Sequence, residues 1–131
     1  EQIESIIRLI LFLKKKYKIR NPNILGHSDI APNRKIDPGI YFPWEFLSKN
    51  SIGLWAKNRM DNSRLDKDGL KLFLKNLQKI GYPYLQLNNT SNLNNFVIES
   101  FHRHHLPNMV KSKPNGTSLN KTIDLLKISI D

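Results

Sequence analysis

Residues 26–39 gather most of the side chains that could do chemistry. They supply one imidazole, two carboxylates, one guanidinium and one ammonium, from His27, Asp29, Asp37, Arg34 and Lys35. The chain has no cysteine, so any metal must be held by His, Asp or Glu, and imidazole and carboxylate suit Zn²⁺. A His and an Asp ten residues apart fit equally well a hydrogen-bonded histidine and an aspartate that caps the following turn. The spacing alone leaves both interpretations open.

The elements around this stretch would position it. The apolar run 24–26 predicts a short buried strand that ends at His27, and the prolines and glycine of residues 28–43 predict a structured loop. Before them, isoleucines at helical spacing predict a helix over residues 1–17, with three lysines in its last turn. The longest apolar run is too short to cross a bilayer, so we expect no transmembrane segment.

The second half reads differently. Polar residues 58–63 predict a linker, and three amphipathic helices follow over about 66–80, 93–105 and 118–128. Asp66 or Asp68 is expected to cap the first helix and Gly81 to end it. The residues expected to face inward are Leu70, Phe73, Leu74, Leu77, Ile80, Phe96, Val97, Phe101, Leu119, Ile123 and Leu126.

The histidines at the end of the second helix and the two tryptophans admit more than one interpretation. We interpret His102, His104 and His105 as a polar face near a helix C-terminus, with a second metal site as the alternative. Trp44 and Trp55 are expected to pack in the core, with stacking on sugar rings as the alternative.

The string His-Ser-Asp-Ile-Ala-Pro-x-Arg-Lys-x-Asp-Pro-Gly over residues 27–39 resembles zinc N-acetylmuramoyl-L-alanine amidases of the type 2 family, as do Phe-Pro-Trp at 42–44 and Gly-Leu-Trp at 53–55. The resemblance implies an α/β fold with helices on a mixed central sheet, of which residues 1–60 would form the C-terminal part. It also implies a small three-helix peptidoglycan-binding-like domain over residues 65–131, where residues 101–104 resemble a Phe-Gln-Arg-His signature.

The resemblance also implies roles for individual residues. His27 corresponds to the second zinc histidine, Asp37 to the zinc aspartate and Lys35 to the lysine that stabilises the oxyanion. From their chemistry alone, Asp29 fits equally well a residue that supports the site by hydrogen bonding and one that caps the loop. Arg34 is interpreted as a solvated arginine, with contact to a substrate carboxylate as the alternative. The family's first zinc histidine and its general-base glutamate have no counterpart before residue 27, so we expect an upstream part of the same protein to supply them. This chain alone is expected to be inactive.

The expected function is therefore cleavage of the amide between N-acetylmuramic acid, in its intact or 1,6-anhydro form, and L-alanine by zinc-activated water. The expected partners are peptidoglycan or muropeptides, and the expected location is the bacterial cell envelope (periplasm or outer membrane) rather than the cytoplasm. The net charge of +10 suits a carboxylate-rich polymer. A non-catalytic peptidoglycan-binding fragment is the alternative. A basic helical nucleic-acid binder is a remote one, because it leaves residues 26–39 unexplained.

Overall fold

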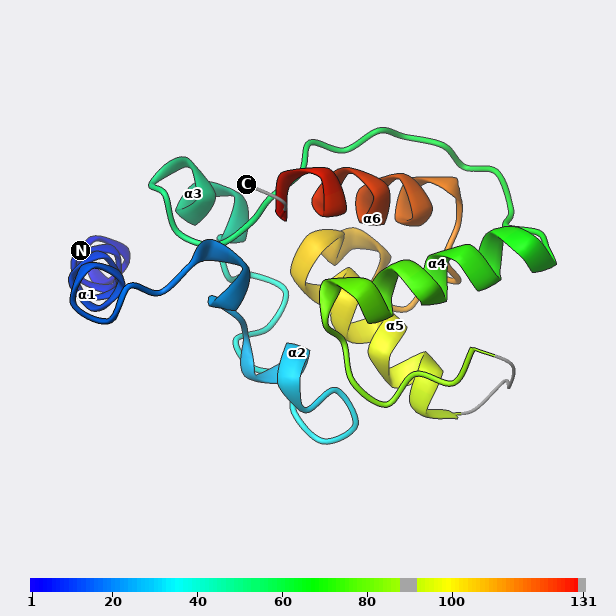
Figure 1. The fold of residues 1–131 in the computed structure, drawn as a ribbon, viewed down its shortest axis with the longest axis horizontal. Coiled ribbons are helices and arrows are strands. Elements are labelled where there is room, and N and C mark those ends of the chain that lie inside the picture. Colours follow the sequence, from blue (N-terminus) through cyan, green and yellow to red (C-terminus); the bar gives the residue numbers. More distant parts are fainter. Residues whose placement is uncertain (88–91, 130–131) are drawn as a thin grey trace.

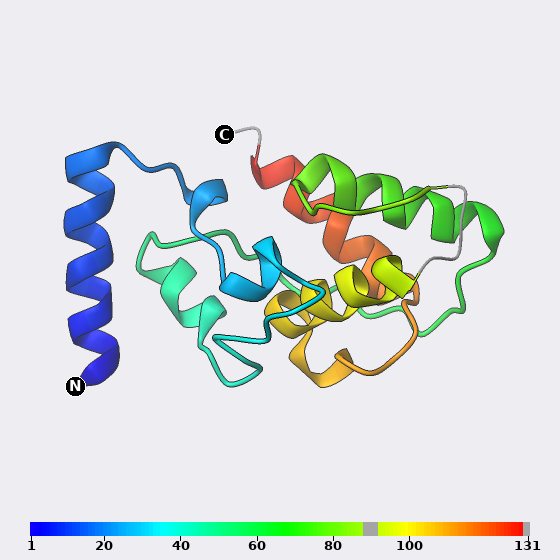
Figure 2. The ribbon, with the colours of Figure 1, turned by 90° about the horizontal axis from the view of Figure 1, so that it is seen from below.

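The computed structural model describes residues 1–87 and 92–129, and in these ranges it contains helices and irregular segments (Figure 1). The elements in chain order are α1 (Gln2–Tyr17), η1 (Asn21–Asn23), α2 (His27–Ile30), α3 (Trp44–Lys49), α4 (Lys67–Ile80), α5 (Asn92–His105), η2 (Pro107–Met109) and α6 (Gly116–Ser129). Figure 2 shows α1 standing at one end of the molecule and α4, α5 and α6 grouped at the other.

The predicted α/β class with a mixed central sheet is wrong for this structure. Ile24 and Gly26 do have extended backbone angles, but α2 begins at His27, where the strand was expected to end. Within the described residues the only β-type pairing is an isolated bridge between Arg64 and Asn115. An apolar run becomes a strand only when a neighbouring segment completes its hydrogen-bond ladder, and no described segment does so for residues 24–26.

The first helix forms where the isoleucine spacing predicts it. Ile7 and Ile10 of α1 pack against a small core of Trp44, Leu47 and Ile52 at α3. Lys14 does more than complement the helix dipole: its ammonium donates to Asn21 Oδ1 (2.7 Å) and to the carbonyl of Ser51. No helix of the described residues is long and apolar enough to cross a membrane.

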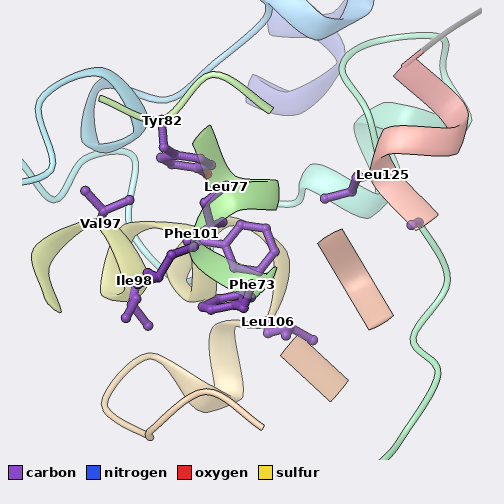
Figure 3. Packing of buried hydrophobic residues seen from close by; sticks show 10 residues of the cluster. Phe73, Leu77, Tyr82, Val97, Ile98, Phe101, Leu106 and Leu125 are labelled. Carbon is purple, nitrogen blue, oxygen red and sulfur yellow. The ribbon is translucent and has the colours of Figure 1, made fainter. Parts of the chain in front are cut away.

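The larger core lies among α4, α5 and α6 (Figure 3). Phe73 of α4 and Phe101 of α5 meet edge to face with ring centroids 5.7 Å apart. The apolar face predicted for α4 is confirmed, and Gly81 ends that helix with φ +123°. The inward placement of Phe96 is wrong, because 42% of its surface is exposed.

The buried face of α6 also differs from the prediction. Leu119, Ile123 and Leu126 are only half-buried, whereas Thr117, Lys121, Thr122 and Leu125 are fully buried. Polar chain covers Thr117 and Lys121, and Thr122 accepts a hydrogen bond from Asn76 of α4 (3.1 Å), so these buried positions carry hydrogen-bonding side chains rather than apolar ones.

That covering chain is the segment predicted as a linker, and it is tied along α6. At one end Lys121 donates to the carbonyl of Ala56 and to Asn58 Oδ1 (2.7 Å). In the middle Arg59 makes two bonds to Asp124, at 2.8 and 3.1 Å. At the other end the amide of Thr117 donates to Asp61 O (2.8 Å). Residues 56–63 are therefore a strap that binds α6, visible above that helix in Figure 1.

The start of α4 provides a test of local stability. Asp66 Oδ1 accepts from the amide of Gly69 at 2.7 Å, so Asp66 rather than Asp68 is the N-cap. We expect Asp66→Ala to lower the free energy of unfolding by about 1 kcal/mol. Asp68→Ala is the matched control, with an expected loss of a few tenths of a kcal/mol from the helix dipole. Equal losses in urea denaturation would contradict the capping assignment.

Candidate functional site

The two residues expected to bind zinc lie together. His27 opens α2 and its Nδ1 is 3.2 Å from Asp37 Oδ2. The backbone joins the same two segments, because the amide of Ser28 donates to the carbonyl of Asp37 at 3.0 Å. The pairing is thus built into the chain and does not depend on a flexible side chain alone.

The donor set and spacing fit zinc. Two ligands at about 2.0–2.1 Å from a tetrahedral ion lie about 3.3 Å apart, close to the observed separation. Both side chains remain accessible, with 46% of His27 and 63% of Asp37 exposed. They are two donors only: the described residues contain no group of three His, Cys, Asp or Glu side chains that could hold a metal. The same contact is also an ordinary ion pair when His27 is protonated.

Gly26 permits the close approach of the two segments. A Cβ at this position would lie 2.7 Å from Pro38 Cδ and 3.3 Å from Asp29 Oδ2. Contacts under 3.0 Å force atoms to move, so any other residue here would push away the loop that carries Asp37.

A hollow of about 260 Å³ lies beside this pair. Its polar rim includes His27 and Asp37, and its wall is apolar, from Ile10 of α1 to Trp44 and Leu47 of α3. A pocket with an apolar wall and few polar groups is the usual form of a small-ligand site.

Lys35 and Arg34 lie in the same loop but in different surroundings. Lys35 is half-buried two residues before Asp37, and Arg34 is exposed. Their amides both donate to the carbonyl of Ala31, which closes the turn after α2. Lys35 is thus held two residues before Asp37 in the chain, and neither its ammonium nor the Arg34 guanidinium has a hydrogen-bond or ion-pair partner among the described residues.

Asp29 is buried within the protein, with 5% of its surface exposed. Its Oδ2 accepts from the amide of Gly26 at 2.8 Å and from His104 Nδ1 at 2.7 Å, and its Oδ1 accepts from the hydroxyl of Tyr82 at 2.6 Å. Burial raises the pKa of Tyr82 well above its usual value of 10, which keeps the proton on the donor. Asp29 therefore connects the site to the part of the chain that carries α4, α5 and α6, which we call the helical half.

The interpretation of the three histidines as a polar surface face is wrong, since all three are buried. His104 stacks between Trp44 and His105, with ring centroids 3.9 Å from each. His102 instead contacts Ser118 Oγ at 2.9 Å. Burial lowers the pKa of His102 to about 4 and that of His105 well below 6.5, so both are neutral at pH 7.

The tryptophans also belong to the interior. Trp44 is buried as predicted, and Trp55 is half-buried beneath the ammonium of Lys121, which lies 3.9 Å from its ring centroid. Burial lowers the pKa of Lys121 to about 8. Trp44 therefore has no free face for stacking on a sugar, whereas Trp55 keeps part of its surface exposed.

The chain resembles known amidases in sequence. Residues 1–40 match the family described as N-acetylmuramoyl-L-alanine amidase. The chain is 44% identical over 54 residues to the Escherichia coli N-acetylmuramoyl-L-alanine amidase AmiD, covering 41% of this chain and 20% of AmiD. It is 51% identical over 45 residues to the Haemophilus influenzae 1,6-anhydro-N-acetylmuramyl-L-alanine amidase AmpD, covering 34% of this chain and 24% of AmpD.

The structural likeness extends further than the sequence likeness. The structure of Escherichia coli AmiD in complex with its substrate anhydro-N-acetylmuramic acid-L-Ala-D-gamma-Glu-L-Lys matches with a TM-score of 0.85 and 28% identity. This match covers 97% of the chain. The chain is similar to the AmiD and AmpD amidases in sequence over part of its length, and to AmiD in fold over nearly all of it. It spans about half of the AmiD structure, 51% of that chain. AmpDh3 from Pseudomonas aeruginosa, at 21% identity and a TM-score of 0.79, shares the fold over 99% of this chain and 54% of its own.

Sequence reasoning missed the partners of Asp29. Tyr82 and His104 lie 53 and 75 residues further along the chain, and no local pattern links them to residue 29. One signal was present, because His104 and His105 lie three and four residues after the core residue Phe101. Helix residues at these spacings share a face, so both histidines belong to the buried side of α5.

The depressed pKa of His102 predicts acid sensitivity. Above pH 6.5 the ring is neutral in both folded and unfolded chains. Between pH 6.5 and 4 only the unfolded chain takes up the proton, so stability falls, by up to about 3 kcal/mol from this residue. His102→Gln keeps an amide near Ser118 but cannot titrate.

We therefore expect chemical denaturation of His102→Gln to show a shallower loss of stability over this pH range than the original chain. His105 and the carboxylates titrate in both proteins, so the difference between the two curves isolates His102. Parallel curves would contradict the assignment.

Proposed function

We propose that this chain contributes to an N-acetylmuramoyl-L-alanine amidase, which hydrolyses the amide between N-acetylmuramic acid and L-alanine of the peptidoglycan stem peptide. The observation that carries the proposal is the His27–Asp37 pair, 3.2 Å apart, in a segment that matches the amidase family over residues 1–40. Zn²⁺ is the cofactor we propose for this pair. Bound there, the ion would polarise the amide carbonyl and activate water.

The roles of the chain's own residues follow from their chemistry. His27 and Asp37 present a nitrogen and an oxygen donor from two segments fixed by the bond between Ser28 and the carbonyl of Asp37. Lys35 is half-buried two residues before Asp37, and we propose that its ammonium stabilises the negative oxygen that develops on the attacked carbonyl. We also propose that Arg34, exposed beside Lys35, contacts a substrate carboxylate.

The names of similar proteins support a proposal for the substrate. AmpD is named for the 1,6-anhydro form, and the AmiD structure holds an anhydromuramyl peptide, which supports muropeptides of this kind as the substrate. We propose cell-wall turnover in the bacterial envelope as the setting. The chain spans about half of AmiD, so the remaining metal ligand and the general base are assigned to other parts of the same protein.

The domain division belongs to this proposal. Residues 1–60 would carry the site and residues 65–131 would hold the wall polymer, with the net charge of +10 favouring its carboxylates. Binding of the wall polymer without hydrolysis is the competing function. The two functions differ in whether the His27–Asp37 pair binds a catalytic metal ion.

Zinc titration of the chain tests the metal assignment. We expect His27→Ala and Asp37→Ala each to weaken Zn²⁺ binding at least tenfold, because each removes a ligand. Asp124→Ala is the control, since its carboxylate is engaged by Arg59 on the far side of α6. Affinities that do not change in either ligand variant would contradict the zinc site.

Lys35→Ala tests catalysis in the complete protein. We expect muropeptide hydrolysis to fall about 10²–10³-fold, the usual cost of losing one group that stabilises an oxyanion. The zinc content should be unchanged. Lys75→Ala, a change of the same kind on the exposed side of α4, should retain full activity. Unchanged turnover in Lys35→Ala would contradict the role of Lys35 in stabilising the oxyanion.

A further inference from the structure

The carboxylate of Asp29 is held from three directions. Only 4% of its side chain is exposed, and it accepts from the amide of Gly26, the hydroxyl of Tyr82 and the imidazole of His104. A carboxylate can only accept, so His104 carries a proton on Nδ1 and donates it. A buried charge is tolerated only when such bonds replace its lost hydration. The position of Asp29 is therefore fixed by donors from the helical half.

Fixing Asp29 also fixes the turn that carries His27. The helix α2 has four residues, too few to be stable through its own hydrogen bonds. Its geometry depends on the closed loop between Gly26 and Asp29, in which the amide of Asp29 donates to Gly26 O (3.1 Å) and the amide of Gly26 donates to Asp29 Oδ2. The adjacent amide of Ser28 then binds the carbonyl of Asp37.

The two side-chain donors are themselves held firmly. His104 is clamped between Trp44 and His105 in a near-parallel stack, at interplanar angles of 14° and 11°. Tyr82 packs edge to face on Phe101 with ring centroids 6.0 Å apart, and Figure 3 shows both rings in the same core. Neither the Tyr82 ring nor the His104 ring can turn without disturbing its neighbours, so both donors are preorganised.

We infer that Tyr82 and His104 are positioning residues for the His27–Asp37 pair, acting through Asp29. The inference rests on the proposed function, in which that pair binds zinc. Neither residue touches the reacting atoms. The role makes the helical half a working part of the amidase site, in addition to any part it has in holding the wall polymer.

The test removes each donor and keeps its ring. Tyr82→Phe deletes the hydroxyl, and His104→Phe keeps an aromatic ring in the stack. Tyr84→Phe is the matched control, because Tyr84 is 54% exposed and lies two residues from Tyr82. Two quantities are measured in each variant: amide hydrogen exchange, residue by residue, and Zn²⁺ affinity.

We expect the amides of Gly26 and Ala31 to exchange at least tenfold faster in Tyr82→Phe and His104→Phe, while the amide of Leu77 within α4 keeps its protection. Zn²⁺ affinity should fall about 10–100-fold, as it does when a supporting partner of a metal ligand is lost. Tyr84→Phe should match the original chain in both measurements.

A purely structural role predicts a different result. Protection would then fall equally at Gly26, Ala31 and Leu77, and zinc affinity would be unchanged under conditions where the chain stays folded; either finding would overturn the inference. If His27→Ala and the original chain bind zinc equally, the proposed function fails, and the exchange data still decide whether the two donors hold the turn. If His104→Phe does not fold, Tyr82→Phe decides, because its ring stays in the core.

Discussion

The burial of one carboxylate governs how this chain is assembled. Asp29 draws its donors from the turn before α2, from the residues after α4 and from the end of α5, so three distant parts of the sequence must meet at one point. The arrangement has a cost. The Nε2 atom of His104 and the Nδ1 atom of His105 are buried and have no hydrogen-bond partner among the described residues. Stacking on Trp44 and the strong bonds to Asp29 offset part of that cost.

The helices could be predicted because their signals are local. Apolar spacing identified α1 and α4, and Asp66 and Gly81 marked the ends of α4. The sheet could not be judged in this way, since residues 24–26 carry the composition of a strand but a strand is defined by its neighbour. The face of α6 was misassigned for a related reason. Thr117 and Lys121 are buried against the polar strap of residues 56–63, and Thr122 is buried against Asn76 of α4, where leucines were expected.

The site was predictable only in part. The spacing of His27 and Asp37, read through a family resemblance, led to the pair that the structure brings together. The same reasoning left Asp29 undecided and placed His104 on the surface, because a charged or polar residue is usually solvated. His104 is buried because it bonds to Asp29, 75 residues earlier in the chain, and no periodicity within one helix can reveal such a contact.

The strap along α6 has a mechanical consequence. Residues 56–63 join the two halves, yet Lys121, Asp124 and Thr117 tie them down from end to end, so they cannot act as a hinge. The distance from the His27–Asp37 pair to the surface of α6 is therefore fixed when the chain folds. Under the proposed function, a glycan strand held by α4, α5 and α6 would meet the His27–Asp37 pair at one fixed distance. Access to the next stem peptide would require the strand to dissociate and bind again, because residues 56–63 do not bend.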